Sequence, residues 1–265
     1  MKQALVSVVD NVEIAKDIFV LRLDEADQAR DVRPGQFVHL RCHNGMGATM
    51  DPLLRRPLSV LRTGACPQND LPPSQYEVLY EVVGRGTGLL VGLRPGDMVD
   101  VLGPLGRPFS IARGTSRLLL VGGGVGIVPL VALAEEALRR DVAVTMLGGF
   151  RAGNKVFPSE LVPAEVEYVV ATDDGSVGRK GFVTELVPEY LDWADQVCSC
   201  GPIPMLRALA TVRRLRRRRP VQIAMEEHMG CAMGVCLGCV IPTRKGNQRV
   251  CRDGPVFDLD EMGWT

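Results

Sequence analysis

The sequence predicts a multidomain protein of the α/β plus β class with three parts. These are an antiparallel β-barrel, an α/β domain with a parallel sheet, and a small C-terminal segment that binds a metal cluster. Short alternating strands fill the first hundred residues, apolar strands alternate with helices in the middle, and closely spaced cysteines follow in the last quarter. A chain of 265 residues has room for two or three such domains. The expected domains span residues 1–102, 103–220 and 221–265.

Charge and hydropathy exclude several classes of partner. The 31 basic and 31 acidic side chains cancel, so we expect no general attraction to nucleic acid or to an anionic membrane. The first residues carry one charge and no long apolar run, unlike a signal peptide. Residues 118–134 lack charges, but this stretch is shorter than the roughly twenty residues of a membrane span, and a glycine triplet and Pro129 interrupt it. We therefore expect a cytoplasmic protein.

The first hundred residues show the two-residue alternation of half-buried strands. Turn sequences separate the strands, among them Arg33-Pro34-Gly35-Gln36 and Pro95-Gly96-Asp97. Frequent turns with little helix predict a small antiparallel barrel. The expected strands span residues 3–9, 18–23, 37–42, 58–61, 76–82 and 98–101.

Two motifs in this barrel offer groups that bind phosphate. Arg55-Arg56-Pro57-Leu58-Ser59 places two guanidinium groups and a hydroxyl at the start of a strand. Gly84-Arg85-Gly86-Thr87-Gly88 follows another strand and can open a helix at Leu89, whose free N–H groups would face an anion. Each motif by itself is more often a charged rim or an ordinary turn.

The middle domain begins after the turn-rich joint at residues 103–109, where the pattern changes. Residues 117–121 form an apolar strand that leads through Gly122-Gly123-Gly124-Val125-Gly126 into a helix. Further strands are expected at 142–149, 166–172 and 196–202, with a closing helix from Pro204 to about Arg218. The glycine turn differs from the two-glycine dinucleotide fingerprint and is a weak signal without support. Cys200, before Gly201-Pro202, is open to reading as a simple buried thiol.

One run of arginines occupies residues 213–219. Such a run is usually a solvated helix end, where cations are favoured by the helix dipole. A contact with a partner protein is the alternative.

Four cysteines in the last quarter have the spacing of an iron–sulfur site. Cys231, Cys236, Cys239 and Cys251 are separated by four, two and eleven residues, as in plant-type ferredoxins. We expect Gly230, Gly234 and Gly238 to supply positive φ angles for the loop and to admit N–H groups to the sulfurs. Structural zinc and disulfides are the alternatives, but zinc sites usually have paired Cys-x2-Cys units. The pattern predicts a [2Fe–2S] cluster. The other cysteines, Cys42, Cys66, Cys198 and Cys200, are expected to be buried free thiols.

The barrel motifs, the glycine turn and the Cys-Gly-Pro turn together resemble the ferredoxin–NADP reductase superfamily. The resemblance implies an FAD on the barrel, with Arg56 neutralising the pyrophosphate and Ser59 near the reactive edge of the isoalloxazine. It also implies a nicotinamide nucleotide across the strand ends of the second domain, with Cys200 beside the carbon that transfers hydride. The implied flavin contacts are Arg56, Pro57, Leu58, Ser59, Leu79, Tyr80, Glu81, Gly86 and Thr87. The implied nucleotide contacts are Gly122, Gly123, Gly124, Gly126, Cys200, Gly201 and Pro202.

The order of the three parts, together with the segments at residues 226–231 and 250–257, closely resembles the electron-transfer subunit family of NAD-linked (class B) dihydroorotate dehydrogenase. The resemblance implies an FMN-containing catalytic subunit as partner, in a heterotetramer with two copies of each chain. Electrons would pass from that FMN through the cluster to FAD and then to NAD+, with orotate formed for pyrimidine (UMP) biosynthesis. No side chain of this chain is expected to act as a catalytic acid or base.

Two kinds of rival remain at this point. One is a subunit of a related flavin and iron–sulfur oxidoreductase, acting on sulfide or between NAD(P)H and ferredoxin, or the diaphorase of a hydrogenase. The other is a zinc-stabilised interaction module without flavin. The sequence leaves both NAD and NADP as acceptors.

Overall fold

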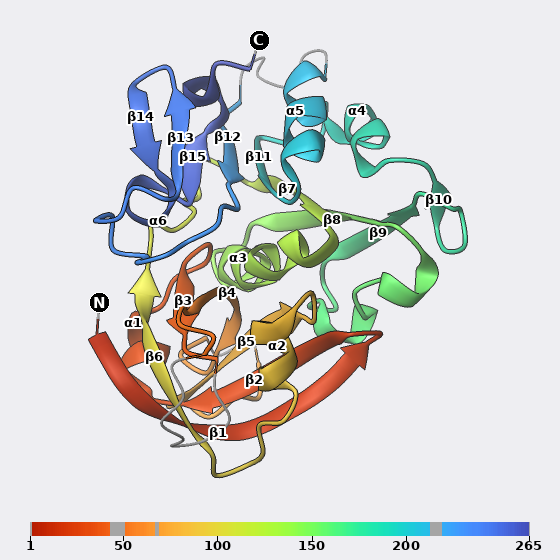
Figure 1. The fold of residues 1–265 in the computed structure, drawn as a ribbon. Helices are drawn as coiled ribbons and strands as arrows, with labels where there is room; N and C mark the ends of the chain where they lie inside the picture. The colour runs from red at the N-terminus through yellow and green to blue at the C-terminus, as the bar shows by residue number, and fades with distance from the viewer. Residues whose placement is uncertain (1, 43–50, 67–68, 213–218, 265) are drawn as a thin grey trace.

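The computed structural model describes residues 2–42, 51–66, 69–212 and 219–264. Its N-terminal part is a closed antiparallel barrel of six strands in the order β1-β2-β5-β4-β3-β6 (Figure 1). The barrel closes because β6 pairs with both β1 and β3. The predicted barrel is confirmed. Its strands are β1 (Lys2–Ala15), β2 (Ile18–Asp24), β3 (Phe37–Leu40), β4 (Arg56–Thr63), β5 (Gln75–Glu81) and β6 (Met98–Leu105).

Local details of the barrel differ from the sequence prediction. β1 runs to Ala15 because two irregularities in its register with β2 let one long strand bend around the barrel. Helix α2 (Arg85–Leu90) begins at Arg85, earlier than expected, and a short helix α1 (Ala26–Asp31) was not expected. α1 is capped by the Glu25 carboxylate, which accepts a hydrogen bond from the Gln28 N–H at 2.6 Å.

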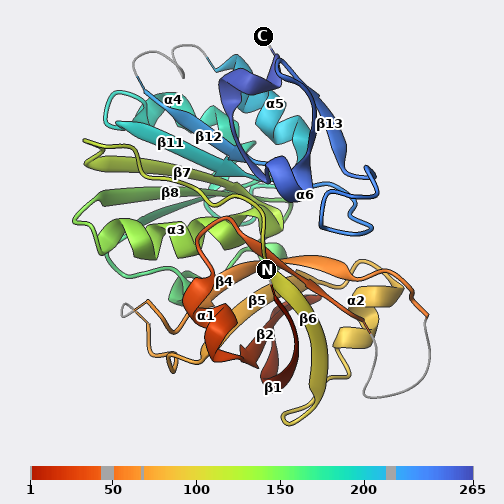
Figure 2. The ribbon, with the colours of Figure 1, turned by 90° about the vertical axis from the view of Figure 1, so that its left-hand side faces the viewer.

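The second domain is built on a seven-stranded sheet in the order β10-β9-β8-β7-β11-β12-β15. All neighbouring pairs are parallel except β12 and β15. Helix α3 (Val128–Leu138) lies between this sheet and the barrel, and α4 (Val187–Tyr190) and α5 (Ile203–Thr211) lie on the opposite face (Figure 2). The strands from the middle domain are β7 (Arg117–Gly123), β8 (Ala143–Phe150), β9 (Glu167–Thr172), β10 (Arg179–Lys180) and β11 (Gln196–Cys200).

The C-terminal segment is joined to this sheet. Its strands β12 (Val221–Ala224) and β15 (Val256–Asp258) extend the sheet beyond β11. Between them lie the cysteine loop, a hairpin of β13 (Val240–Thr243) and β14 (Gly246–Arg249), and helix α6 (Val250–Asp253). One apolar core runs from α5 and the sheet into this segment and includes Cys239 and Cys251. The cysteine loop is therefore held against the seven-stranded sheet, because both contribute to one apolar core.

Polar contacts, one of them buried, hold the barrel against the second domain. Arg62 on β4 pairs with Glu135 on α3 at 3.0 Å, and the Glu135 side chain is only 3% exposed. The Asn69 side-chain amide donates to the same carboxylate at 3.0 Å. Lys155 makes a second link because its ammonium donates to Glu81 at 2.9 Å and to the Lys16 carbonyl at 2.8 Å. The Arg62–Glu135 pair helps to fix the relative orientation of the two domains, because the buried Glu135 charge would be strongly unfavourable without its partner.

Part of the predicted arginine helix lies outside the described residues. α5 ends at Thr211, and residues 213–218 are not among those the structure describes. Arg219 is described, and its guanidinium donates to the Leu191 carbonyl. Among the described residues, no helix is long and apolar enough to cross a membrane.

Asp195 ties the start of β7 to the start of β11. Its carboxylate accepts hydrogen bonds from the Ser116 and Arg117 N–H groups and pairs with the Arg117 guanidinium at 3.0 Å. The hydrogen bond from Arg117 and those from Ser116 lower the pKa of this carboxyl to about 2, against an ordinary value of 3.8. A lowered pKa stabilises the fold above about pH 4, and this contribution is lost as pH falls towards 2.

We therefore expect Asp195→Asn to lower the free energy of unfolding by about 1 kcal/mol at pH 7, the modest value reflecting partial exposure and solvent screening. Urea unfolding at pH 7 and at pH 3 measures this, with the difference from wild type shrinking at the lower pH. A difference that grows on acidification would contradict the assignment.

Candidate cofactor site

The predicted flavin strand is β4, and its outer face is turned towards the second domain. Leu58 is buried in the barrel core, so the strand alternation turns Pro57 and Ser59 outward. On the neighbouring strand β5, Leu79 packs outside the barrel against the α3 core, whereas Tyr80 points inward. Leu58 and Tyr80 can therefore face a bound flavin only through their main chain.

Tyr80 is held inside the barrel by its own contacts. Its ring stacks on Phe19 with centroids 5.4 Å apart, and its hydroxyl donates to the Asn11 side chain at 3.0 Å. Burial raises the pKa of Tyr80 to about 12, so the phenol stays neutral. Its structural role explains why the side chain is unavailable to a ligand on the outer face.

The two arginines of the strand motif separate in the structure. Arg55 turns to the barrel end, where it pairs with Asp100 at 2.5 Å and donates to the Asp100 carbonyl at 2.8 Å. Arg56 turns the other way, to the start of α2. A Cβ on Gly86 would lie only 2.8 Å from the Arg56 Nε atom, so glycine is needed there for the guanidinium to lie against the helix. This places one guanidinium beside the Gly-Thr motif, as a pyrophosphate site requires.

Thr87 has a role within the fold. Its hydroxyl accepts a hydrogen bond from the Val83 N–H at 3.1 Å and donates to the Gly84 carbonyl at 3.3 Å. These bonds fix the first turn of α2. The hydroxyl therefore shapes the predicted site while its hydrogen-bonding capacity is largely occupied.

The two predicted nucleotide turns lie side by side at the carboxyl ends of β7 and β11. Gly122 is the register partner of Cys200. A Cβ on Gly126 would lie 2.4 Å from the Cys200 carbonyl oxygen, and a Cβ on Gly123 would lie 3.0 Å from Pro202. Close packing between the turns thus explains these glycines. Gly124 is exposed, has φ +54° and faces open space.

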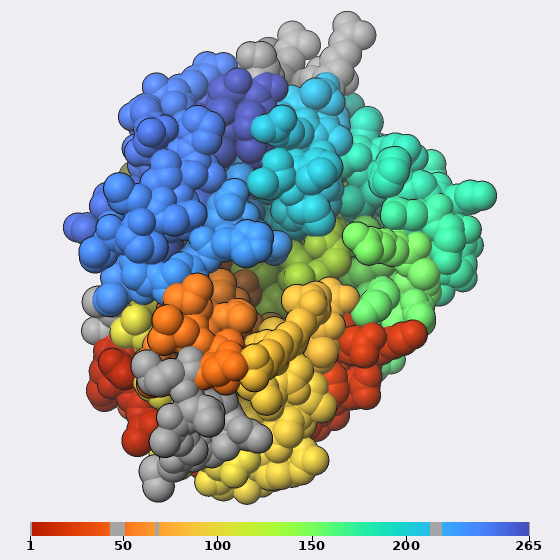
Figure 3. All heavy atoms as spheres, viewed as in Figure 1, coloured from red at the N-terminus to blue at the C-terminus, as the bar shows by residue number. Residues whose placement is uncertain are grey.

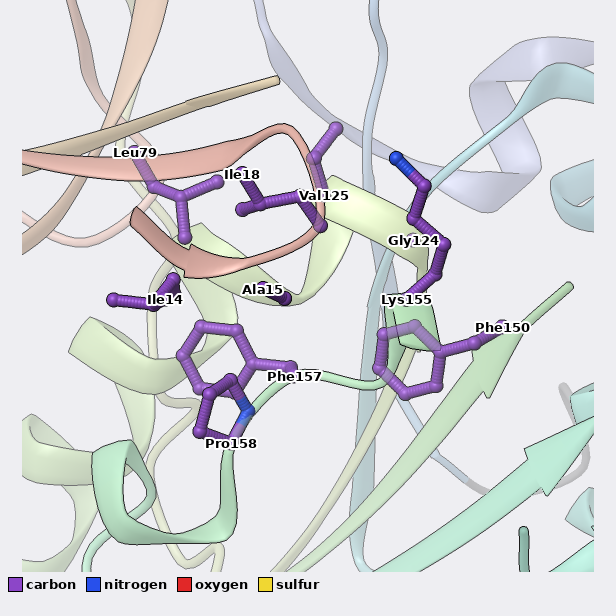
Figure 4. Close-up of a pocket in the computed structure, with 10 residues that line it drawn as sticks. All are labelled: Ile14, Ala15, Ile18, Leu79, Gly124, Val125, Phe150, Lys155, Phe157 and Pro158. Carbon is purple, nitrogen blue, oxygen red and sulfur yellow. The ribbon is translucent and has the colours of Figure 1, made fainter. Parts of the chain in front are cut away.

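One predicted flavin contact and one predicted nucleotide contact line the same interdomain pocket. Leu79 of β5 and Gly124 of the glycine turn line the same small apolar pocket, together with Phe150 and Lys155 (Figure 4). On the molecular surface, a hollow lies where the segments of β4, α2 and the cysteine loop meet the second domain (Figure 3). Ligands of open α/β sheets bind beyond the carboxyl ends of the strands, which is where this space lies.

Glu226 joins the cysteine segment to the Cys-Gly-Pro turn, and sequence reasoning did not single it out. The Cys200 thiol donates to its carboxylate at 3.8 Å. Glu226 is exposed to solvent, yet desolvation by surrounding protein raises the pKa of its carboxyl, which is the signature of a group lying in a cleft. Burial also raises the pKa of Cys200, and Glu226 adds to this shift. The available sequence signal was a charged residue directly after the apolar strand that ends at Ala224. In the structure Ala224 is the register partner of Cys200, which brings Glu226 close to the thiol.

The four predicted cluster ligands lie together in two pairs. The Cys236 N–H donates to the Cys231 sulfur at 3.4 Å, and the Cys251 N–H donates to the Cys239 sulfur at 3.5 Å. In the described part of the chain, no three His, Cys, Asp or Glu side chains are close enough to hold a single metal ion. Two thiolate pairs fit a two-iron cluster, in which each iron takes two cysteines.

Main-chain N–H groups favour ionisation of Cys231, one member of the outer pair. Burial opposes the charge on Cys231, but N–H groups from Cys236, Met233 and Val235 outweigh it and lower the pKa of the thiol to about 6. The thiolate is the form that binds metal. Cys251 lies deeper, and burial followed by its contact with Cys239 raises its pKa to about 12. Metal binding at Cys251 would therefore release the proton of its thiol.

The glycine prediction for this loop was partly wrong. Among the three glycines only Gly234 has a positive φ, at +80°, and the loop also turns at Ala232 and Leu237. A Cβ at Gly230 or Gly238 would lie 3.4 or 3.6 Å from the Cys236 sulfur, an ordinary contact distance, so neither packing nor a positive φ explains glycine at these two positions. Of the other cysteines, Cys42, Cys198 and Cys200 are buried, whereas Cys66 is half-buried.

The barrel, the parallel sheet with its glycine turn and the paired cysteines together define a nicotinamide–flavin reductase fold with an appended iron–sulfur segment. Comparison with known proteins agrees. A family profile described as the iron–sulfur cluster binding domain of dihydroorotate dehydrogenase B matches residues 226–263. The electron transfer subunit of dihydroorotate dehydrogenase B (NAD(+)) from Geobacillus kaustophilus is 44% identical over 87% of this chain and 86% of its own length. The subunit of the same name from Geobacillus sp. WCH70 is 40% identical over 99% of both chains. The chain belongs to the family of dihydroorotate dehydrogenase B electron transfer subunits.

Solved structures show the same fold. The structure of an NADH-dependent reduced ferredoxin–NADP oxidoreductase, from work on flavin-based electron bifurcation, matches with a TM-score of 0.83 and 30% identity over 98% of this chain and 90% of that one. An Amycolatopsis cytochrome P450 reductase matches with a TM-score of 0.65 and 25% identity over 84% of this chain and 69% of that one. The predicted fold class and family resemblance are confirmed.

Proposed function

We propose that this chain carries FAD and a [2Fe–2S] cluster and passes electrons from the FMN of a dihydroorotate dehydrogenase catalytic subunit to NAD+. The observation that carries the proposal is that parts of all three segments come together. Leu79 of the barrel and Gly124 of the glycine turn line one interdomain pocket, and Glu226 of the segment that holds the cluster cysteines accepts a hydrogen bond from Cys200, whose turn packs against the glycine turn. Convergence of this kind suits a relay, because electron transfer needs the cofactors close together.

The electron count supports the same assignment. Dihydroorotate gives up two electrons, NAD+ accepts two as a hydride, and a [2Fe–2S] cluster carries one at a time. A flavin on each side of the cluster can exchange two electrons with its substrate and one electron at a time with the cluster. Arg56 would neutralise the pyrophosphate of FAD. Ser59 would lie near the reactive edge of the isoalloxazine, and Cys200 would lie beside the nicotinamide carbon that transfers hydride. The protein groups orient the cofactors, and none is required as an acid or base.

The cluster loop offers a docking surface for the catalytic subunit. Three apolar side chains around the exposed Cys236 point to solvent: Met233 is 43% exposed, Val235 75% and Leu237 61%. Exposed apolar residues clustered on one loop are typical of a protein interface. This surface also puts the outer sulfur pair nearest to a partner, which shortens the path into the cluster.

We expect Val235→Asp to weaken assembly with the catalytic subunit at least about tenfold, because a charge would be desolvated in the interface. Co-purification and a Kd from analytical ultracentrifugation measure this, with cluster content checked by absorbance. Val12→Asp, on the exposed face of β1, is the matched control and should assemble normally. Equal assembly by both variants would place the interface elsewhere.

The function itself is tested by coupled activity. The chain is co-expressed with a class B catalytic subunit, and NADH formation from dihydroorotate is followed in the purified complex. NADH that requires both chains supports the proposal. A complex with flavin and cluster that makes no NADH would move the assignment to the ferredoxin- or sulfide-linked reductases, a reading favoured by the 30% identity to the ferredoxin–NADP oxidoreductase. A purified chain without the visible absorbance of flavin or of an iron–sulfur cluster would favour a zinc-stabilised module instead.

Compartment and stoichiometry belong to the same proposal. A cluster held by thiolates needs reduced cysteines, which suits the cytoplasm. A heterotetramer with two copies of each chain is the expected assembly, and mass photometry of the complex tests it. NAD is the proposed acceptor, which parallel assays with NADP would examine.

A further inference from the structure

Arg249 ends β14 directly before α6, the helix that carries the cluster cysteine Cys251, and the proposed function does not use it. Its side chain is 30% exposed. All three guanidinium nitrogens donate hydrogen bonds. Nε and Nη2 donate to the two Asp253 oxygens at 2.9 and 3.1 Å, and Nη1 donates to the Gly234 carbonyl at 3.1 Å. The guanidinium therefore joins α6 to the turn at Gly234 in the cysteine loop.

The contact with Asp253 is explained by the helix itself. The two residues are four apart, and the Arg249 N–H also donates to the Asp253 carboxylate at 2.9 Å. The carboxylate thus ties the start of α6 to its end. The bond to Gly234 lies outside that arrangement, because neither end of α6 requires it. Any further role of Arg249 therefore lies in the cysteine loop.

The Gly234 carbonyl belongs to the same peptide unit as the Val235 N–H. That N–H donates to the Cys231 sulfur at 3.3 Å, the shortest of the three main-chain N–H contacts with this sulfur. In a planar trans peptide the carbonyl and the N–H point in opposite directions, so a bond on one side restrains the group on the other. Arg249 thus holds the carbonyl while the N–H faces the sulfur.

Glycine is favoured at position 234 by this packing. Gly234 has φ +80°, and a Cβ there would lie 2.7 Å from the Arg252 Cδ atom and 3.4 Å from the Arg249 Nη1 atom. Both arginines therefore lie against the turn. In the described part of the chain, only Arg249 donates a hydrogen bond to the Gly234 carbonyl. Arg252 is exposed, so it offers a comparison that has the same charge without the same bond.

Hydrogen bonds to the sulfurs and nearby charge both set the reduction potential of an iron–sulfur cluster. A reduced cluster carries one more negative charge than an oxidised one, so an N–H directed at a sulfur stabilises the reduced form and raises the potential. The Arg249 charge is balanced by Asp253 at 2.9 Å, so the pair adds little net charge beside the site. We therefore expect the orientation of the N–H to contribute more than the charge.

We propose that Arg249 is a positioning residue for the cluster, which holds the Gly234–Val235 peptide so that the Val235 N–H stays on the Cys231 sulfur and raises the reduction potential. The inference rests on the proposed function, because it takes a [2Fe–2S] cluster to be bound at the four cysteines. In each transfer one electron leaves a reduced flavin and the oxidised cluster gains it. Arg249 itself exchanges neither an electron nor a proton.

The test compares Arg249→Gln with wild type in the full-length chain loaded with both cofactors, and a redox titration followed by EPR gives the cluster potential. Without the guanidinium the peptide can turn away from the sulfur. We expect a lower potential, equivalent to at least about a tenfold change in the electron-transfer equilibrium, or about 59 mV. Proton ENDOR of the reduced cluster in H2O and D2O should show a weaker coupling to one exchangeable proton. A merely structural clamp would lower the melting temperature and move neither readout.

A charge-matched variant separates orientation from charge. Arg249→Gln leaves Asp253 unpaired, and an unpaired carboxylate would by itself lower the potential. Arg249→Gln combined with Asp253→Asn restores the net charge, and we expect this double variant to keep more than half of the shift. Recovery of more than half would overturn the positioning role, because charge would then account for most of the effect. Arg252→Gln is the control and should stay within about twofold of wild type, or about 18 mV, because an exposed charge is screened.

A potential within about twofold of wild type in a fully loaded Arg249→Gln protein would overturn the inference and leave the proposed function intact. If that variant does not load its cluster, Arg249→Lys is judged by the same titration. Lysine keeps the charge but loses the planar fork, so the equilibrium should change by at least about threefold, and no change would equally overturn the inference. A wild-type chain without a [2Fe–2S] signal after reduction would instead contradict the proposed function itself.

Discussion

Cys236→Ser should lower dihydroorotate-driven NAD+ reduction by at least about a hundredfold, a loss equivalent to about 2.7 kcal/mol of activation free energy. Cys236 belongs to the outer sulfur pair with Cys231 and is the exposed member. Serine oxygen is a harder and more basic ligand than thiolate, so one iron of the cluster would lose its proper coordination. Electrons from the catalytic subunit would then have no one-electron carrier to the flavin.

The flavin half of the protein should survive this change. Cys236 lies far in sequence from the flavin strand β4 (Arg56–Thr63), which belongs to the barrel with its own core. We therefore expect the variant to keep FAD and to retain NADH-driven reduction of ferricyanide through it. Absorbance and EPR report the cluster, and Cys198→Ala, at a buried cysteine in β11, is the matched control. Dihydroorotate-driven NADH formation in a cluster-free variant would refute the proposed path.

Gly126→Ala should lower both the stability of the second domain and the rate of NADH-driven flavin reduction. A Cβ at this position would lie 2.4 Å from the Cys200 carbonyl oxygen and 2.7 Å from the Gly201 Cα atom, both backbone atoms that cannot rotate away. The two turns must separate, at a cost of about 2–4 kcal/mol in the free energy of unfolding. Because Cys200 moves with its turn, NADH-driven flavin reduction should fall by about tenfold to a hundredfold.

Thermal unfolding and steady-state ferricyanide reduction measure the two effects separately. Gly92→Ala is the control, since a Cβ there meets only the Leu89 carbonyl oxygen at an ordinary 3.5 Å. It should leave both the melting temperature and the NADH kinetics near wild type. Wild-type values for Gly126→Ala would show that the turns have more room than their packing indicates.

The sequence by itself determined the architecture and the chemical type of each site. Two-residue alternation fixed the barrel strands, the glycine-ended apolar strand at residues 117–126 fixed the start of the parallel sheet, and cysteine spacing fixed the cluster loop. These signals are local, because each depends on neighbours within a few residues. Element ends were less certain, as the long β1 and the early start of α2 illustrate.

Only the tertiary structure decided which side chains of a motif face the site. Arg55 pairs with Asp100, whereas Arg56 lies beside Gly86. The side chains of Leu58 and Tyr80 are buried in the barrel. The tertiary structure also joined the tail to the central sheet through β12 and β15, which brings Glu226 to Cys200. These outcomes depend on packing between segments more than a hundred residues apart along the chain in some cases, and no local pattern records such contacts.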